Sequence, residues 1–210
     1  RMKDIISNGQ LGDLRSIIVY QNGTLFNAAS HHFDVMYLLN GDSPASWVMA
    51  SIPEDETLIN GLDLTNDPLA EGIIQFSNNV TGYALLSPRA TEWQAICDNG
   101  TITALNHDAN LEIRTASSAS TAKRPQWDER ILVDYQPASS TANLIEDLVT
   151  SLDTGSPTQG GIQIAKANTE LIFAFITSHL NDGAKIRLPL DSCKLRLNRR
   201  SKPKQPKFNK

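Results

Sequence analysis

Hydrophobic and polar positions follow two different periods in the first forty residues. Residues 13–20 contain the β-branched run Ile17-Ile18-Val19, which predicts a strand. A short amphipathic helix is expected before it, over residues 2–8. Over residues 28–39 the period becomes helical. Four residues then fall at i, i+3, i+4 and i+7 and share one helix face: His31, Asp34, Val35 and Leu38.

The middle of the chain is rich in short strand patterns separated by turn residues. Asn78-Asn79 and Asn99-Gly100 lie between consecutive strand candidates, where hairpin turns are expected. Residues 53–68 have no clear period and are predicted to be an irregular insertion, and residues 115–128 are predicted to be a loop. The predicted strands cover residues 46–52, 72–77, 80–87, 92–97, 101–105, 111–114 and 131–135.

Two helices dominate the last third of the chain. A serine at 139 or 140 can cap a helix that ends near residue 152, and a longer amphipathic helix is predicted over residues 162–180. A final strand is expected over residues 185–190. Because the strands occur in a run and the helices are segregated from them, the pattern predicts an α+β fold with a mostly antiparallel sheet.

The composition is that of a globular protein. Of 210 residues, 40% are hydrophobic and 20% are charged, which excludes a wholly disordered chain. The apolar stretch over residues 171–176 is far shorter than the roughly 20 residues that cross a bilayer, so no membrane association is expected. No signal peptide is visible, and the first residue is Arg1 rather than Met. We therefore expect the chain to begin inside a longer gene product.

The net charge of −4 conceals an uneven distribution. All 23 acidic residues lie at or before Asp191, whereas 8 of the 19 basic residues lie between Lys194 and Lys210. This predicts a domain over residues 1–192 and a basic, disordered tail over residues 193–210. A basic tail can bind nucleic acid, but the acidic body argues against a nucleic-acid-binding domain.

The two cysteines, Cys97 and Cys193, have no further Cys or His at metal-ligand spacing, so no metal site is predicted. Two isolated cysteines fit a reduced cytoplasmic protein better than a disulfide scaffold.

The best candidate for chemistry is the group Asn27, His31 and Asp34. A histidine can take or give a proton near neutral pH. Asn27, just before the helix, could orient the imidazole or contact a bound hydroxyl, and Asp34 lies one turn beyond and could hold the ring. The alternative is a structural histidine satisfied by a neighbouring carboxylate. His32 points to another face and is interpreted as structural.

A second candidate set lies in the predicted loop, where Lys123, Arg124 and Trp127 could contact a ligand. The alternative is that Trp127 is a core or interface aromatic residue. The glycines form neither G-x-G-x-x-G nor a P-loop.

Taken together, these segments resemble the second domain of the glucose–fructose oxidoreductase / inositol dehydrogenase / MocA (Gfo/Idh/MocA) family over about residues 1–190. Each segment alone is weakly specific, but their order and spacing match the family's pattern. The matching segments are residues 1–17 with Gly12-Asp13-Leu14, Ser30-His31-His32-Phe33-Asp34 with Asn40-Gly41-Asp42, residues 92–102 with Gly100, and the closing residues 144–155 and 165–189.

The resemblance implies an open-faced sheet with helices packed on one face, which builds a substrate site and joins subunits into a homo-oligomer. In that family an N-terminal Rossmann domain binds NAD or NADP, and His31 matches the catalytic histidine. Many members have Asp where this chain has Asn27, which cannot act as a base, so proton transfer would fall to His31. The family's lysine, in a Glu-Lys-Pro motif, has no counterpart in this sequence.

Two hypotheses follow. The first is that the chain is the substrate-binding and oligomerisation half of an NAD(P)-dependent oxidoreductase acting on a small molecule such as a sugar or cyclitol. The isolated chain would then lack the Rossmann domain, bind no cofactor alone and be inactive. The second is a non-catalytic module that binds a protein or ligand through the exposed sheet face.

Overall fold

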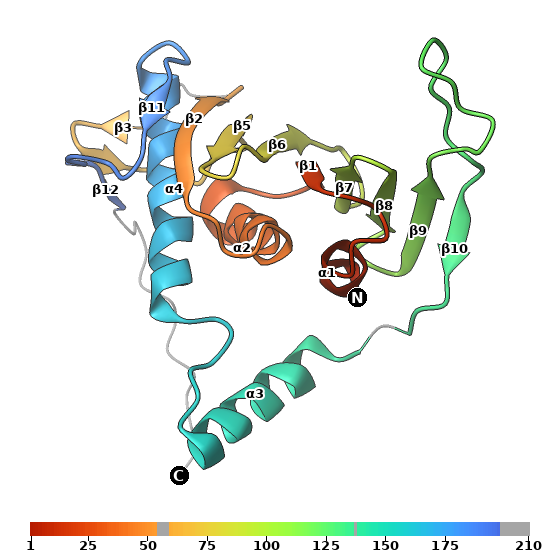
Figure 1. The fold of residues 1–210 in the computed structure, drawn as a ribbon. Helices are drawn as coiled ribbons and strands as arrows, with labels where there is room; N and C mark the ends of the chain where they lie inside the picture. The colour runs from red at the N-terminus through yellow and green to blue at the C-terminus, as the bar shows by residue number, and fades with distance from the viewer. Residues whose placement is uncertain (54–58, 137, 198–210) are drawn as a thin grey trace.

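The computed structural model describes residues 1–53, 59–136 and 138–197. The main structural element is a nine-stranded sheet (Figure 1). The order across the sheet is β10-β9-β8-β7-β1-β6-β5-β2-β11, and within it only the β1–β6 pair is parallel. The strands are β1 (Leu14–Gln21), β2 (Ala45–Ser51), β5 (Glu71–Phe76), β6 (Thr81–Leu86), β7 (Glu92–Cys97), β8 (Gly100–Leu105), β9 (Asn110–Thr115), β10 (Ile131–Val133) and β11 (Ile186–Arg187). The prediction of an α+β fold with an open, mostly antiparallel sheet is confirmed.

Helices lie on one face of this sheet (Figure 1). These are α1 (Met2–Ser7), α2 (Ser30–Leu39), which directly follows the π-helical turn η1 (Leu25–Ala29), and α4 (Ile162–Leu180). α4 buries Leu171 and Phe175, and the Phe175 ring lies 5.1 Å from the Phe33 ring of α2. These contacts join α2 and α4 into the main hydrophobic core.

The remaining helix, α3 (Ser140–Thr154), differs from the others because it has no buried residue. Its cap is well formed: the Ser139 hydroxyl accepts a hydrogen bond from the Ala142 N–H, and Gly155 ends the helix in the left-handed conformation. Nevertheless, α3 lies apart from the sheet, below α1 and α2 in Figure 1. None of the helices in the described residues is both long and apolar enough to span a membrane.

A second, smaller sheet joins β3 (Ile59–Asn60), β4 (Asp63–Leu64) and β12 (Arg196–Leu197). Part of the predicted irregular insertion therefore forms a short hairpin, and the start of the predicted basic tail pairs in parallel with β4. The prediction of disorder over residues 198–210 lies outside the described residues.

Successive side chains of β7 point to opposite faces of the sheet. Along β7, Ala95 and Cys97 are buried on the helix side, whereas Gln94 and Ile96 point to the opposite, open face. The β7–β8 hairpin also packs against the segment that follows α1. A side chain at Gly100 would approach the Leu11 side chain to 2.5 Å, which explains why a residue without a Cβ occupies this position.

Candidate functional site

His31 is the second residue of α2, and its side chain is exposed on the helix side of the sheet. The chain enters α2 through η1, in which the Ala29 N–H bonds to the Thr24 carbonyl five residues back. The sequence pattern predicted one helix from residue 28. The π-helical turn is therefore a correction, and such turns occur frequently at functional sites.

The carboxylate of Asp67 holds the η1 turn in place. Its two oxygens accept hydrogen bonds from the Phe26 N–H at 2.7 Å and the Asn27 N–H at 3.1 Å, and one also accepts from the Thr24 hydroxyl. These N–H groups lie in the first turn, where helix donors lack partners along the chain. Asp67 thus fixes the backbone position of Asn27 at the start of η1. Because α2 follows η1 directly, Asp67 also helps to set the position of His31. The sequence pattern did not reveal this role, because Asp67 lies in a segment without periodicity.

Asn27 and Asp34, the predicted partners of His31, occupy the two neighbouring turns and are both exposed. Asp34 Oδ1 accepts a hydrogen bond from Asn168 Nδ2 of α4 at 3.4 Å. Asn168 is itself buried. Asp34 therefore links α2 to α4 as well as lying one turn from His31, and its action on the imidazole remains a prediction.

Lys123, Arg124 and Trp127 lie away from His31. All three are exposed on the loop that connects β9 to β10, which extends beyond the sheet in Figure 1. Trp127 borders a polar pocket on the open face, together with Gln94 and Thr103. His31 lies on the helix face, so within one chain the structure does not bring these two predicted sets together.

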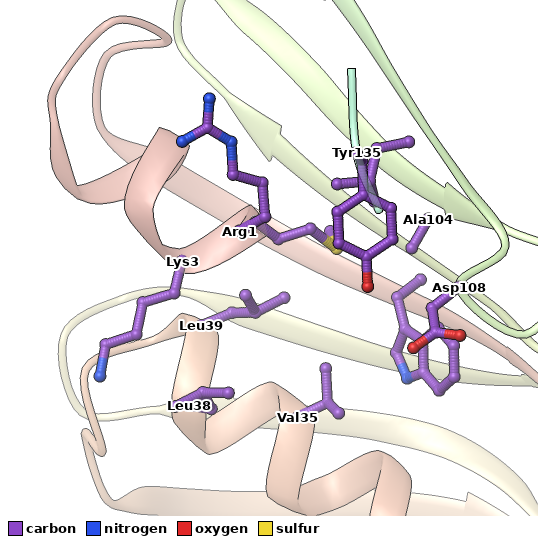
Figure 2. A pocket seen from close by; sticks show the side chains of 11 residues that line it. Arg1, Lys3, Val35, Leu38, Leu39, Ala104, Asp108 and Tyr135 are labelled. Atoms are coloured by element: carbon purple, nitrogen blue, oxygen red, sulfur yellow. The ribbon is translucent and has the colours of Figure 1, made fainter. Parts of the chain in front are cut away.

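Beside the His31 face of α2 lies a pocket of about 190 Å³, between α1, α2 and strands β7 to β9. Its α2 wall includes Val35, which is one helical turn beyond His31. Figure 2 shows the Tyr135 hydroxyl and the Asp108 carboxylate on the side opposite Val35. Partial burial and the charge of Asp108 raise the pKa of Tyr135 above its ordinary value. Trp93 forms a further wall.

His32 differs sharply from its neighbour because its side chain is only 5% exposed. Its ring lies 5.7 Å from the Trp93 ring, and neither ring nitrogen has a hydrogen-bond partner among the described residues. Burial, followed by the proximity of His31 and His107, lowers the pKa of His32 to about 4. His32 is therefore neutral at physiological pH, as expected for a structural residue.

The comparisons with known proteins rest on structure. No protein-family model matches the sequence, and no curated protein matches it. Solved structures do match, at low sequence identity. Levoglucosan dehydrogenase in complex with NADH and L-sorbose shares 15% identity, with a TM-score of 0.67 over 90% of this chain. The aldose-aldose oxidoreductase of Caulobacter crescentus, complexed with glycerol, shares 13%, with a TM-score of 0.65 over 89%.

An NAD-binding oxidoreductase from Klebsiella pneumoniae gives a TM-score of 0.68 at 14% identity. This chain has the fold of Gfo/Idh/MocA-type oxidoreductases. The resemblance predicted from the sequence is thus confirmed for the fold. The chain spans only 62%, 59% and 63% of these three oxidoreductases.

The described residues contain no Rossmann-type dinucleotide site. A Rossmann-type site needs a parallel strand–helix–strand unit with a glycine-rich turn at the helix start. The nine-stranded sheet has a single parallel pair, β1–β6, and the sequence has no G-x-G-x-x-G. This chain's own residues instead offer the exposed side chain of His31 and a small, partly apolar pocket that begins one helical turn away, at Val35.

Proposed function

We propose that this chain is the substrate-binding and oligomerisation half of an NAD(P)-dependent oxidoreductase that acts on a hydroxyl of a sugar or cyclitol. The observation that carries the proposal is His31, exposed at the start of a helix whose entry is fixed by Asp67. Acid–base chemistry on an alcohol needs such a group, rigidly placed and open to a ligand.

In this proposal the imidazole of His31 takes the proton of the substrate hydroxyl, or returns it in the reverse direction. Asn27 cannot act as a base, but its amide can hydrogen-bond a substrate hydroxyl. Asp34, anchored on Asn168, would hold the orientation of His31. A nicotinamide supplied by another domain would exchange hydride with the substrate carbon.

We further propose that the dinucleotide-binding domain packs on α3. Five apolar side chains of this helix form one exposed stripe: Leu144, Ile145, Leu148, Val149 and Leu152. A helix with an apolar stripe normally buries it against another element. The space of about 630 Å³ bordered by α3 and Asp34 of α2 lies on the His31 side of the sheet. A domain placed there would adjoin both helices.

Titration of the chain with nucleotides tests the proposal that a separate domain binds the dinucleotide. We expect NADH and NADPH fluorescence to show no saturable binding to residues 1–210, because the described residues form no Rossmann-type strand–helix–strand unit. Tight binding by this chain alone would contradict the proposal that the cofactor is held by a separate domain.

The open face of the sheet supports the oligomerisation part of the proposal, and also the alternative of a non-catalytic interaction module. An apolar groove of about 400 Å³ crosses β2, β5 and β6 and is bordered by Met49, Tyr83 and Leu85. Exposed apolar patches of this kind mark association sites. In a homo-oligomer built on this face, the loop with Lys123 and Arg124 could reach a substrate only in another copy.

We also propose a cytoplasmic location for the whole protein. In the described part of the chain Cys97 and Cys193 are both free thiols, and Cys97 is buried. Free thiols suit a reducing compartment.

A further inference from the structure

The polar pocket on the open face of the sheet has no part in the proposed function. It lies over β7, β8 and β9, on the side opposite His31, and the loop between β9 and β10 borders it with Trp127 and Arg130. Its volume is about 270 Å³. Because drug-sized ligands need roughly 300–1,000 Å³, this pocket suits a smaller molecule.

Two guanidinium groups line this pocket, but only one carboxylate does. Ile113 of β9 pairs with Ile131 of β10, and continuing this register brings Arg114 beside Arg130. Arg130 Nη1 donates a hydrogen bond to Glu112 Oε2 at 3.2 Å, so the one carboxylate is already paired. Like charges placed side by side are unfavourable unless an anion compensates them. The pocket therefore has one excess positive charge, that of Arg114.

Arg114 is held in place without being neutralised. Its Nε–H donates to the Asp128 carbonyl oxygen at 3.1 Å, and the Asp128 N–H donates to the Thr115 carbonyl oxygen at 2.9 Å. The two Nη groups of Arg114 have no hydrogen-bond or ion-pair partner among the described residues, and the side chain is partly exposed. A fixed guanidinium with free N–H groups matches the two oxygens of a carboxylate.

The other walls of the pocket supply a hydroxyl and apolar surface. Thr101 lies opposite Arg114 across β8 and β9, so its hydroxyl can donate to the same anion. Ile96, the partner of Thr101 on β7, and the Trp127 ring are apolar. An occupant therefore needs an anionic end and a short apolar body.

We infer that this pocket binds a small monocarboxylate with an apolar body. The carboxylate oxygens accept hydrogen bonds from the Nη groups of Arg114 and from the Thr101 hydroxyl, and the body lies on Trp127 and Ile96. A phosphate dianion fits less well, because only one cation in the pocket lacks an anion and phosphate has no apolar surface. The inference goes beyond the proposed function and does not depend on His31.

Benzoate and benzamide provide a direct test, because they have nearly the same shape but differ in charge. The sequence has three tryptophans, so a ¹H–¹⁵N spectrum of the full chain contains three indole N–H signals, which Trp→Phe variants assign. At constant ionic strength we expect benzoate to move the Trp127 signal and to leave those of Trp47 and Trp93 in place. Benzamide and inorganic phosphate should bind at least about tenfold more weakly than benzoate.

Two variants with opposite expected effects test the charges. Arg114→Gln should weaken benzoate binding about 10- to 100-fold, because a charged donor is lost. Glu112→Gln should strengthen binding about threefold, because the pocket loses its one carboxylate while the amide oxygen can still accept from Arg130. Arg89→Gln, an exposed arginine outside the pocket, is the matched control and should leave binding unchanged.

The titration is run on the wild-type chain and on Leu85→Lys, which keeps the open face accessible if copies associate through the apolar groove. A Trp127 signal that benzoate moves in neither protein would overturn the inference. Equal affinity for benzoate and benzamide, full affinity of Arg114→Gln, or weaker binding by Glu112→Gln would also overturn it. These outcomes leave the proposed function unaffected, since nucleotide titration and His31→Ala test that separately.

Discussion

His31 and His32 are adjacent in sequence but have opposite surroundings. His31 is exposed, whereas His32 is enclosed against Trp93 with both ring nitrogens unpartnered in the described residues. The difference follows from helix geometry, since successive side chains point about 100° apart. One histidine is therefore available for proton transfer, and the other is part of the core.

The pKa of His32 predicts how stability depends on pH. It is about 4 in the folded chain and about 6.5 when unfolded. Between these values the unfolded chain binds more protons, so the free energy of unfolding falls as pH drops. The loss attributable to His32 is of order 3 kcal/mol, complete near pH 4.

His32→Phe should remove this loss, and it should also be neutral or stabilising at pH 7.5, because two unpartnered nitrogens disappear. Urea unfolding of both proteins at pH 7.5, 5.5 and 4.5 would show the difference. Parallel decreases in the two proteins would show that His32 contributes nothing to the acid sensitivity.

At the scale of elements, the strands from β5 to β9 lie within about two residues of their predicted positions because each alternates on a half-buried sheet. The π-helical turn could not be predicted, since it depends on Asp67, forty residues away in sequence. The pocket beside α2 was also unpredictable from the sequence, because Trp93 and Asp108 come to border it only through strand pairing.

Gly100 tests the packing of the β7–β8 hairpin. An added Cβ would lie 2.5 Å from Leu11 Cδ2 and 2.6 Å from the Arg114 carbonyl oxygen, and the latter is backbone that cannot turn away. Gly100→Ala should therefore destabilise the chain by about 1–3 kcal/mol. Gly160→Ala is the control, because nothing lies within 4 Å of its added Cβ. Equal unfolding midpoints for the two variants would contradict the described packing.

Because α3 has no buried residue, a matched pair of leucine substitutions tests whether this helix packs on the rest of the chain. Leu148 on α3 is 51% exposed, whereas Leu171 on α4 is fully buried. In this chain Leu171→Ala should cost about 2–5 kcal/mol and Leu148→Ala no more than about 0.5 kcal/mol. Denaturant unfolding measures both. A large cost for Leu148→Ala would mean that α3 already packs on this chain rather than awaiting a second domain.

At the scale of the whole molecule, the sheet separates two surfaces with different roles in our account. The helix side carries His31, the pocket beside α2 and the exposed stripe of α3. The open side carries the apolar groove and Trp127. A protein with this arrangement can assemble through one face while the other stays accessible to substrate and to a dinucleotide-binding domain.

Assembly through the open face can be measured by size-exclusion chromatography with light scattering. We expect the chain to form a homo-oligomer that Leu85→Lys dissociates, because a charge would be buried in the groove. Leu152→Lys, on the exposed stripe of α3, should leave the oligomer intact. A strict monomer at high concentration, or dissociation by Leu152→Lys alone, would place the interface elsewhere.

The most direct test of the central claim is turnover by the protein that carries both domains. His31→Ala should lower kcat about 10²- to 10⁴-fold, the range for loss of a general acid–base group, with little change in KM. His179→Ala is the control and should leave kcat unchanged. His179 lies near the C-terminal end of α4, about 16 Å by helix rise from Asn168, the residue of α4 that contacts Asp34. Unchanged turnover in His31→Ala would contradict the account and favour a non-catalytic module.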